Sequence, residues 1–274
     1  MGGDRWHGKR VKTSKKKGSD VMRRFCYRCG ALEAKQGPLI NGLCQRCFVE
    51  ENRLLRVPPE LEIIICGRCG AYVVDGRWHQ ASGDDPITEA ARRTALSSIR
   101  LAHSTFGEMK LLRPEDVPKV ALSVRVRRDE GVVDVRATGK IHELQTEPQV
   151  EEAHITFKIK RVTCDACTLK SAHHYEAIIQ VRGKFKCSDV RKTLERIATE
   201  ASGQDRMAFI SRVEEHRKGV DFYVNPVRLA RQMAGVLRSR FGAEVKESKK
   251  LVGQTRDGRK RYKFTISVRI GGGS

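Results

Sequence analysis

The clearest alternation of hydrophobic and polar positions lies in the C-terminal part of the chain. Every second residue from Tyr175 to Val181 is apolar, which predicts a strand with one buried face that includes Tyr175. The same reasoning predicts, in order, a helix capped by Ser188 with an inner stripe over 190–201, strands at 208–213 and 219–224, a helix opened by Asn225-Pro226, and a terminal hairpin turned by Asp257-Gly258. The order βαββαβ with one extra strand predicts an α+β domain of ferredoxin-like character over residues 171–270.

The middle of the chain predicts a smaller domain with one helix and a sheet. Asp85 and Pro86 have the character of an N-cap and a first helical turn, and the helix continues from Ile87 to about His103 with alanines on its inner side. Three alternating segments predict strands at 120–126, 133–137 and 155–159. We therefore expect one helix packed on an antiparallel sheet, in an inserted domain over residues 76–159.

Nine cysteines, eight of them in four CxxC pairs, indicate metal binding. The pairs are Cys26 and Cys29, Cys44 and Cys47, Cys66 and Cys69, and Cys164 and Cys167. Consecutive pairing gives two sites, the second interrupted by 94 residues; an interleaved pairing that joins the first pair to the last is the alternative. Four thiolates close a tetrahedral site, so we expect two structural zinc ions in a zinc-ribbon module over 25–75 and 160–170. We expect the remaining Cys187 to serve packing.

The two ends of the chain show no apolar periodicity. Residues 1–24 carry nine basic groups against two acidic ones, which predicts a disordered basic tail. Residues 271–274 have the composition of a linker remnant. The N-terminus has no apolar signal-peptide core, and no apolar run reaches the roughly 20 residues of a membrane span. With cysteine spacing typical of metal binding in a reducing compartment, this predicts a cytoplasmic protein without a membrane partner.

The net charge adds a class of partner. Lysine and arginine number 54 against 33 aspartate and glutamate, which gives a formal net charge of +21. Residues 25–170 carry 22 basic against 20 acidic groups, whereas residues 171–274 carry 23 against 11. A small domain needs only a few net charges for solubility, so the C-terminal excess predicts contact with nucleic acid.

Two predicted elements concentrate the basic side chains. Arginines on the helix after Pro226 share the face opposite the apolar one and, with Gly235 between them, form a bare stripe that suits phosphate oxygens, although a solvated face is the alternative. The hairpin carries like charges near its tip, which repel one another unless an anion neutralises them. Aromatic residues make up only 6% of the chain, so we expect phosphate and shape recognition of folded RNA rather than base stacking. The candidate RNA-binding residues are Arg182, Arg228, Arg231, Arg238, Lys249, Lys250, Arg256, Arg259, Lys260 and Arg261.

Several strings of residues resemble one known family. They are the four CxxC pairs in this order with their long insertion, the segment HYEAIIQVR at 174–182 and the segment GVDFYV at 219–224. From Cys26 to about Ile270 the chain is similar to the Nmd-three family, the adapters for nuclear export and late assembly of the large ribosomal subunit. The resemblance implies that the family's eight zinc thiolates are the eight CxxC cysteines.

The resemblance also implies a function and partners. It implies a non-catalytic factor on the subunit-joining face of a nearly mature large subunit, over the tRNA sites and close to the sarcin-ricin loop, where it blocks premature subunit joining. The implied partners are rRNA and proteins of the large subunit, alongside the anti-association initiation factor six, and we expect a monomer. Eukaryotic members continue into a further β-domain and a tail with export and import signals. The shorter chain resembles an archaeal member, for which we expect subunit binding without nuclear export.

Two other functions are alternatives on the residues alone. A zinc-ribbon transcription factor would bind DNA, but such a protein normally presents a helix with Asn, Gln or Arg spaced for base edges, and the basic groups here lie on a hairpin and a helix stripe. An RNA-modifying enzyme would need a glycine-rich cofactor loop, a Cys-His dyad or a pair of carboxylates in a pocket, and the sequence supports none of these. We therefore expect a binding factor that is not an enzyme.

Overall fold

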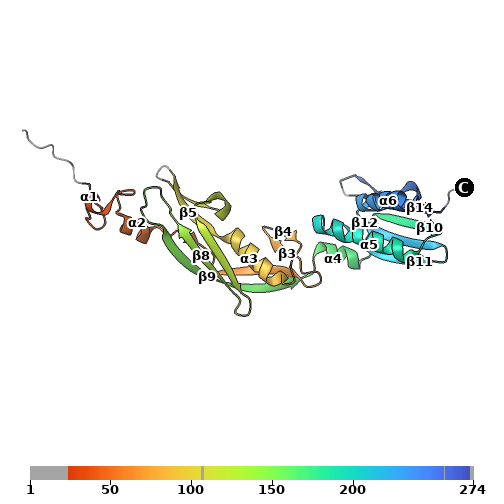
Figure 1. Cartoon of the computed structure of the whole chain (residues 1–274), viewed down its shortest axis with the longest axis horizontal. Helices are drawn as coiled ribbons and strands as arrows, with labels where there is room; N and C mark the ends of the chain where they lie inside the picture. The colour runs from red at the N-terminus through yellow and green to blue at the C-terminus, as the bar shows by residue number, and fades with distance from the viewer. Residues whose placement is uncertain (1–23, 106–107, 256, 272–274) are drawn as a thin grey trace, which may run out of the picture. The chain divides into compact units, whose positions relative to one another are not determined.

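The structure, a computed structural model, describes residues 24–105, 108–255 and 257–271. Helices and sheets are mixed throughout these residues, which confirms the predicted α+β class (Figure 1). The chain divides into two compact units. The first contains the described residues up to Arg56, Arg100–Leu122 and Ala137–Glu151, and the second contains Val57–Ile99, Ser123–Arg136 and the described residues from Glu152 onward.

Some predictions concern residues or boundaries that these observations do not test. The predicted basic tail, apart from Arg24, lies outside the described residues, and so do residues 272–274 of the predicted linker remnant. The predicted domain boundaries stay a prediction. Among the helices that the structure describes, none combines the length and the apolarity needed to cross a membrane.

The first unit contains two short helices and a small antiparallel sheet. Its elements are α1 (Glu33–Gln36), α2 (Gln45–Glu51), β1 (Leu55–Arg56), β5 (Arg100–Thr105), β6 (Glu108–Leu112) and the 3-10 helix η1 (Pro114–Asp116). β5 lies between β1 and β6. Leu101 of β5 is fully buried, and the N–H of Ala102 donates to the carbonyl of Leu54 at 2.8 Å. This sheet is therefore formed with the segment that directly follows α2.

A six-stranded sheet runs through the middle of the chain in the order β4-β3-β2-β9-β8-β7. Its strands are β2 (Glu60–Cys66), β3 (Tyr72–Val74), β4 (Arg77–His79), β7 (Ala121–Arg127), β8 (Val132–Gly139) and β9 (Gln149–Val162). The last three confirm the predicted strands. β2 pairs parallel with β9, with Cys66 opposite Val162, and antiparallel with β3. The sheet is therefore mixed and not antiparallel as predicted, because the segment before the insertion pairs with the segment that ends it.

α3 (Pro86–Ser98) packs on β2 and β3 (Figure 1). Asp85 caps this helix as predicted, since its side chain accepts hydrogen bonds from the N–H groups of Ile87 and Thr88. The predicted continuation to His103 is wrong, because the chain becomes extended at Ile99 and then forms β5. Pairing of β5 with strands on both sides outweighs the helix propensity of the alanines in this segment.

The C-terminal elements follow the predicted order. They are α4 (Asp165–Ser171), β10 (Ala177–Gly183), α5 (Cys187–Gln204), β11 (Phe209–His216), β12 (Gly219–Asn225), α6 (Val227–Phe241), β13 (Glu244–Gln254) and β14 (Lys260–Ile270). The five strands form one sheet in the order β11-β12-β10-β14-β13. β14 pairs parallel with β10 and leaves β13 at the edge. The extra strand of the fold, β14, is therefore inserted between β10 and β13 and is not added at the edge of the sheet.

Both long helices of this domain cover the same face of the sheet. The buried apolar residues of β10, β12 and β14 occur at every second position, and Leu194 of α5 and Met233 of α6 belong to the same buried cluster. Ile179 and Phe222 near its centre are fully buried. Because successive side chains of a strand point to opposite faces, Tyr223 lies on the face away from this core, where it is half-buried.

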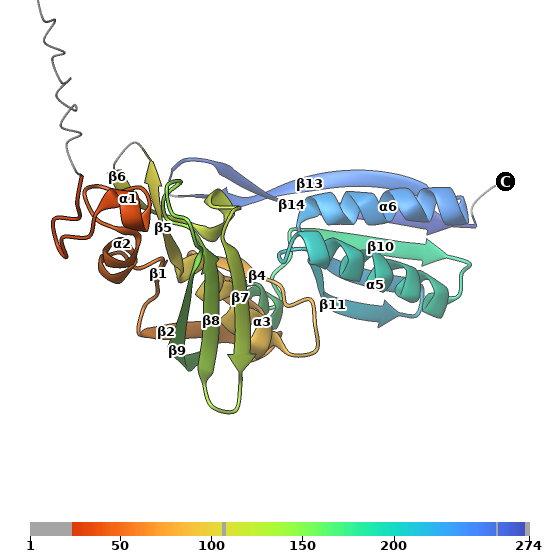
Figure 2. The same cartoon turned by 60° about the vertical axis from the view of Figure 1, so that its left-hand side comes forward.

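β13 and β14 form the predicted terminal hairpin, with Glu244 opposite Arg269 and Gln254 opposite Lys260. Gly258 in the turn has a φ of 81°, a conformation that glycine adopts without steric cost. Each strand has 11 residues, against 7 in β10, so the hairpin extends past the rest of the sheet (Figure 2).

Two local predictions in this domain are wrong. α5 begins at Cys187 with Lys186 as its N-cap and without a side-chain cap, so Ser188 lies inside the first turn and does not cap it. Tyr175 precedes β10, and its ring contacts Tyr223 on the face away from the core. The alternation of buried and exposed side chains therefore begins at Ala177, the first residue of β10, and Tyr175 is not part of the buried face.

Candidate metal centres and nucleic-acid interface

Four cysteines of the first unit converge on one point. They are Cys26, Cys29, Cys44 and Cys47, and their sulfur atoms all lie within 4.8 Å of one another. The Sγ atoms of Cys29 and Cys44 are 3.6 Å apart. A tetrahedral zinc ion with Zn–S distances of about 2.3 Å places its sulfur atoms about 3.8 Å apart. The group could hold a metal ion, and its donors and dimensions fit zinc.

Two tight turns present these sulfur atoms. The N–H of Gly30 donates to the carbonyl of Cys26 at 2.8 Å, and Gly30 has a φ of 74°, which favours glycine. Cys44 is the N-cap of α2, and its carbonyl accepts a hydrogen bond from the N–H of Phe48 at 2.9 Å. Gly42, with a φ of 82°, turns the chain before it. Each CxxC pair is thus positioned by local backbone geometry that the sequence encodes with a nearby glycine.

The surroundings of this group lower the pKa of one cysteine and raise the pKa of another. Burial raises the pKa of Cys26, but N–H groups of Cys44, Cys29 and Arg28 outweigh it and lower that pKa to about 6. Burial and the neighbouring thiols raise the pKa of Cys47 to about 12. Because cysteine binds metal as a thiolate, a metal ion entering the group would displace the proton of Cys47.

The second group combines cysteines that are distant in the sequence. It contains Cys66, Cys69, Cys164 and Cys167, whose sulfur atoms also lie within 4.8 Å of one another. The Sγ atoms of Cys69 and Cys164 are 3.7 Å apart, and the N–H of Cys164 donates to the Sγ of Cys66 at 3.4 Å. The parallel pairing of β2 with β9 brings the two ends of the 94-residue insertion together. The structure thus has the consecutive grouping of cysteines and not the interleaved one.

Arg206 contacts the second group from the loop between α5 and β11. Its Nη2 donates to the Sγ of Cys164 at 2.8 Å, and its guanidinium lies over the ring of Trp78, 5.2 Å from the centroid. Four thiolates around a divalent metal carry two net negative charges, which a guanidinium at this position partly neutralises. Sequence reasoning missed Arg206, because no spacing links it to the cysteines and only the fold brings it to them.

Three of the predicted RNA-binding arginines outside the hairpin have carboxylate partners within the chain. Arg182 Nη1 donates to Oδ1 of the buried Asp221 at 2.6 Å. Arg228 pairs with Asp205. Arg231 makes two hydrogen bonds to Glu247, the shorter of 2.7 Å, and this contact lowers the pKa of Glu247. The predicted stripe on α6 is therefore not bare.

Arg238, the third arginine of that stripe, is exposed, and among the described residues it has no carboxylate partner. Gly235 beside it is also exposed, and a side chain added there would meet no atom within 4 Å. This part of α6 is therefore open to a partner, and a role of the stripe in RNA contact stays a prediction.

The hairpin differs from α6 in its charge pairing. Lys249, Lys250, Lys260 and Arg261 are exposed, and no carboxylate in the described part of the chain lies within ion-pair distance of them. Arg259 pairs with Asp257 at 3.1 Å. The predicted site residue Arg256 lies outside the described residues. The hairpin thus presents a cluster of cations without an ion-pair partner among the described residues, although Lys249 is near enough to Glu247 to help lower the pKa of that carboxyl.

Aromatic rings lie close to these cations, which sequence reasoning also missed. Lys263 Nζ lies 3.5 Å from the centroid of the Tyr175 ring, and Lys249 Nζ lies 5.2 Å from that of Tyr262. The rings of Tyr175 and Tyr223 meet edge to face with centroids 4.9 Å apart. Three of the five tyrosines are thus gathered in one basic domain, a concentration that the overall aromatic content of 6% conceals.

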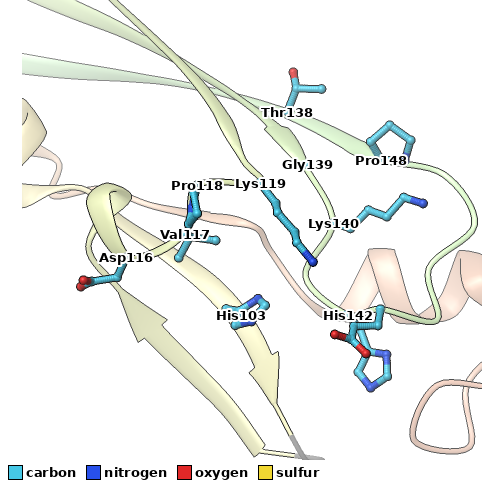
Figure 3. A pocket seen from close by; sticks show the side chains of 11 residues that line it. His103, Asp116, Val117, Pro118, Lys119, Thr138, Gly139, Lys140, His142 and Pro148 are labelled. Atoms are coloured by element: carbon cyan, nitrogen blue, oxygen red, sulfur yellow. The ribbon is translucent and has the colours of Figure 1, made fainter.

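A cavity of about 570 Å³ lies in the first unit. Lys119 points into the space between His103 and His142 (Figure 3). Asp116 and Glu143 also line the cavity, so its charge is mixed. This lining favours neither an anion nor a cation, and we assign the cavity no ligand.

Comparisons with known proteins match almost all of the described chain to one family. The family described as "NMD3, N-terminal domain" matches residues 26–172, and the family described as "NMD3, second domain" matches residues 174–270. Comparison with curated proteins finds no match. The first match contains both four-cysteine groups, and the second contains the α+β domain with its basic hairpin. The chain therefore belongs to the NMD3 family of ribosome-biogenesis and export-adapter proteins.

Proposed function

We propose that the chain binds the joining face of the large ribosomal subunit through rRNA, acts in late assembly of that subunit and prevents premature subunit joining. The single observation that carries this proposal is the hairpin cluster of Lys249, Lys250, Lys260 and Arg261, which has no carboxylate partner among the described residues. Membership of the NMD3 family supports the large subunit as the source of the anion.

The outer face of α5 shows what a merely solvated charged surface looks like in the same domain. Arg191 pairs with Glu195 at 2.9 Å, and Arg196 pairs with Glu200 at 3.5 Å, each one helical turn apart. These pairs cancel their own charge. The hairpin concentrates like charges instead, which costs repulsion unless a polyanion such as rRNA neutralises them.

We further propose that both four-cysteine groups hold zinc as a structural ion. Each group offers four thiolates and therefore leaves no open position for a substrate or for catalytic water. On this proposal the factor has no enzymatic activity, and the metals fix the shape of the chain around them.

The remaining parts of the proposal follow from the family and not from geometry. We propose a monomer that works in the cytoplasm, in an archaeal-type assembly pathway, on the same large subunit as the anti-association initiation factor six. Each of these statements is open to direct measurement, by the mass of the free protein and by the composition of particles that it copurifies with.

Sedimentation with purified subunits tests the proposed docking. The chain is mixed with isolated large subunits, with isolated small subunits and with both together, and each mixture is resolved on a sucrose gradient. We expect the protein in the large-subunit fraction, and we expect the yield of joined ribosomes to fall as its concentration rises. Equal binding to small subunits, tighter binding to duplex DNA than to the large subunit, or an unchanged yield of joined ribosomes would contradict the proposal.

A further inference from the structure

A cavity of about 320 Å³ lies between the turn end of the hairpin and the segment just before β10, on the basic C-terminal domain. Residues just before β10 and the first residues of β14 line it, among them Tyr175, Tyr262, Lys260, Arg261 and Lys263. The volume is at the lower end of the range for small-molecule pockets, which is about 300–1,000 Å³. The cavity therefore has room for one compact ligand rather than for a folded element.

The charge of the lining selects an anion. No carboxylate of the described residues lies within ion-pair distance of Lys260, Arg261 or Lys263. Glu176 also lines the cavity, but its Oε2 accepts a hydrogen bond from the N–H of Val227 at 2.9 Å, at the start of α6. The carboxylate is thus held at the start of α6, and its single negative charge is opposed by the three cations of the lining, which leaves a net positive charge for a ligand.

The aromatic rings that line the cavity favour a ligand that also has a flat apolar surface. Tyr175, Tyr262 and Phe264 contribute to the cavity, and Lys263 lies over the Tyr175 ring. Val252 also lines it and, like its neighbour Leu251, is about half exposed, at 47% and 53% respectively. Exposed apolar side chains beside the cations of the hairpin suit a partner that is both flat and charged.

One chemical class has both properties at this size. A nucleotide joins a planar base, which stacks on aromatic rings, to a phosphate, which pairs with lysine and arginine. An acidic peptide would use the cations without the rings, and free phosphate would leave the apolar part of the cavity unfilled. A base within a duplex is covered by its neighbours on both sides, so a base that enters this cavity must be unpaired.

We propose that this cavity binds a single unpaired nucleotide of RNA, whose base packs among the tyrosines and whose phosphates meet Lys260 and Arg261. The inference rests on the proposed function, because it assigns a subsite within the proposed rRNA contact. It adds base stacking to an interface for which composition alone predicts only phosphate and shape recognition.

The probe is a short RNA hairpin whose stem contains one bulged 2-aminopurine nucleotide, compared with the same stem fully paired. Binding of the full zinc-loaded chain to both RNAs is measured by fluorescence, and stacking changes the emission of the bulged base. We expect tighter binding of the bulged RNA. Tyr175→Leu should weaken that binding roughly tenfold to a hundredfold, which corresponds to about 1.4–2.8 kcal/mol, and leave the paired stem unaffected.

Matched variants separate stacking from damage to the domain. Tyr175→Phe keeps a ring and should bind the bulged RNA like wild type, and Tyr262→Leu should reproduce the loss. Tyr27→Leu, a change of a 65% exposed tyrosine in the first unit, should alter neither RNA complex. Lys260→Gln should weaken binding of both RNAs and make the dependence on salt shallower by about one unit.

The failure of this subsite and the failure of the proposed function give different results. Equal affinity of wild type for both RNAs, or wild-type affinity of both leucine variants for the bulged RNA, overturns the nucleotide site. If large-subunit binding then still depends on Lys249 and Lys250, the proposed function stands without the subsite. If the wild-type chain binds neither RNA nor the large subunit, the proposed function itself fails.

Discussion

The second four-cysteine group and the core of the C-terminal domain stabilise neighbouring parts of the chain by different means. The buried cluster at the cysteines contains three residues, of which two, Cys66 and Cys164, are themselves candidate ligands. The cluster under α5 and α6 contains nineteen buried residues within the described chain. Burial of apolar side chains can therefore hold the C-terminal domain, whereas we propose that a bound ion is the main source of stability directly around the second cysteine group.

The same two regions differ in charge. Residues 25–170, which contain all eight CxxC cysteines, are almost balanced, with 22 basic against 20 acidic groups. Residues 171–274 carry 23 against 11. The excess of positive charge is thus in the region that contains the C-terminal domain, where the exposed cations of the hairpin lie outside the buried cluster under α5 and α6. In this domain the buried apolar side chains provide stability, and we propose that the exposed cations of the hairpin provide binding.

Removal of metal gives the largest expected difference between the two regions. A structural zinc site contributes about 10–16 kcal/mol in finger peptides, so a chelator should unfold the segments around both cysteine groups. Amide hydrogen exchange should show lost protection at Phe48 and retained protection at Phe222. Native mass spectrometry should find two zinc ions per chain before chelation. The variant Cys187→Ser should also hold two, because Cys187 lies outside both cysteine groups. Full protection at Phe48 in the metal-free protein would contradict the comparison.

A truncation in the apolar core should act in the opposite region. Phe222→Ala removes a fully buried ring and should lower the free energy of unfolding of the C-terminal domain by about 3–5 kcal/mol. Urea denaturation followed by fluorescence and exchange measures this loss, and the zinc content of the first group should not change. A loss below about 1 kcal/mol would show that the cavity collapses and that this core is not the main source of stability.

Arg206 belongs to the C-terminal domain and contacts the second cysteine group, so its replacement tests whether the two regions are coupled. Arg206→Gln removes the charged donor to Cys164 and should weaken metal binding at the second group about tenfold to a hundredfold, as changes around metal ligands typically do. Competition with a chromophoric chelator measures each site. The control Arg196→Gln changes an exposed arginine of α5 and should affect neither site. Equal weakening of both groups would contradict a local role of Arg206.

Acidification should weaken metal binding and leave the apolar core in place. Protons compete with zinc for the thiolates, so affinity falls as pH falls, by about tenfold per pH unit for each proton released. The raised pKa of Cys47, about 12, means that the metal-free first group keeps this proton at neutral pH and releases it on binding. Calorimetry in buffers of different ionisation enthalpy counts the released protons. Zinc affinity that is independent of pH between 6 and 8 would contradict thiolate ligation.

Patterns that are local in the sequence predicted local structure well. Alternation and helical stripes predicted the C-terminal elements in order, because a buried face there needs only regular spacing of apolar residues. The CxxC spacing identified the candidate ligands for the same reason. The helix was extended wrongly to His103, because pairing of β5 with β1 and β6 depends on residues distant in the chain.

The parts of the candidate sites that sequence patterns missed are contacts between distant segments. Arg206 reaches Cys164 only through the packing of α4 near β11, and the carboxylates that engage Arg228 and Arg231 lie in other elements. β14 takes its place beside β10 by parallel pairing that the hairpin signal does not specify. A composition of 6% aromatic residues likewise gave no indication that Tyr175 and Tyr262 line one basic cavity.

Neutralisation of the hairpin should have the smallest effect on stability and a large effect on binding. The variant carries Lys249→Gln, Lys250→Gln, Lys260→Gln and Arg261→Gln. These side chains are exposed, so the free energy of unfolding should change by no more than about 0.5 kcal/mol for each. The matched control removes four exposed cations elsewhere in the domain, with Lys184, Lys192, Arg217 and Lys218 each changed to Gln.

The salt dependence of large-subunit binding by these two variants shows whether the hairpin docks on rRNA. Each neutralised phosphate steepens the slope of log affinity against log salt by roughly 0.7–0.9 units. We expect the hairpin variant to bind more weakly, with a slope shallower by about one unit for each phosphate that it no longer neutralises, and we expect the control to keep the affinity and slope of the wild-type chain. Wild-type affinity and slope in the hairpin variant, or an equal loss in both variants, would contradict docking on rRNA through the hairpin.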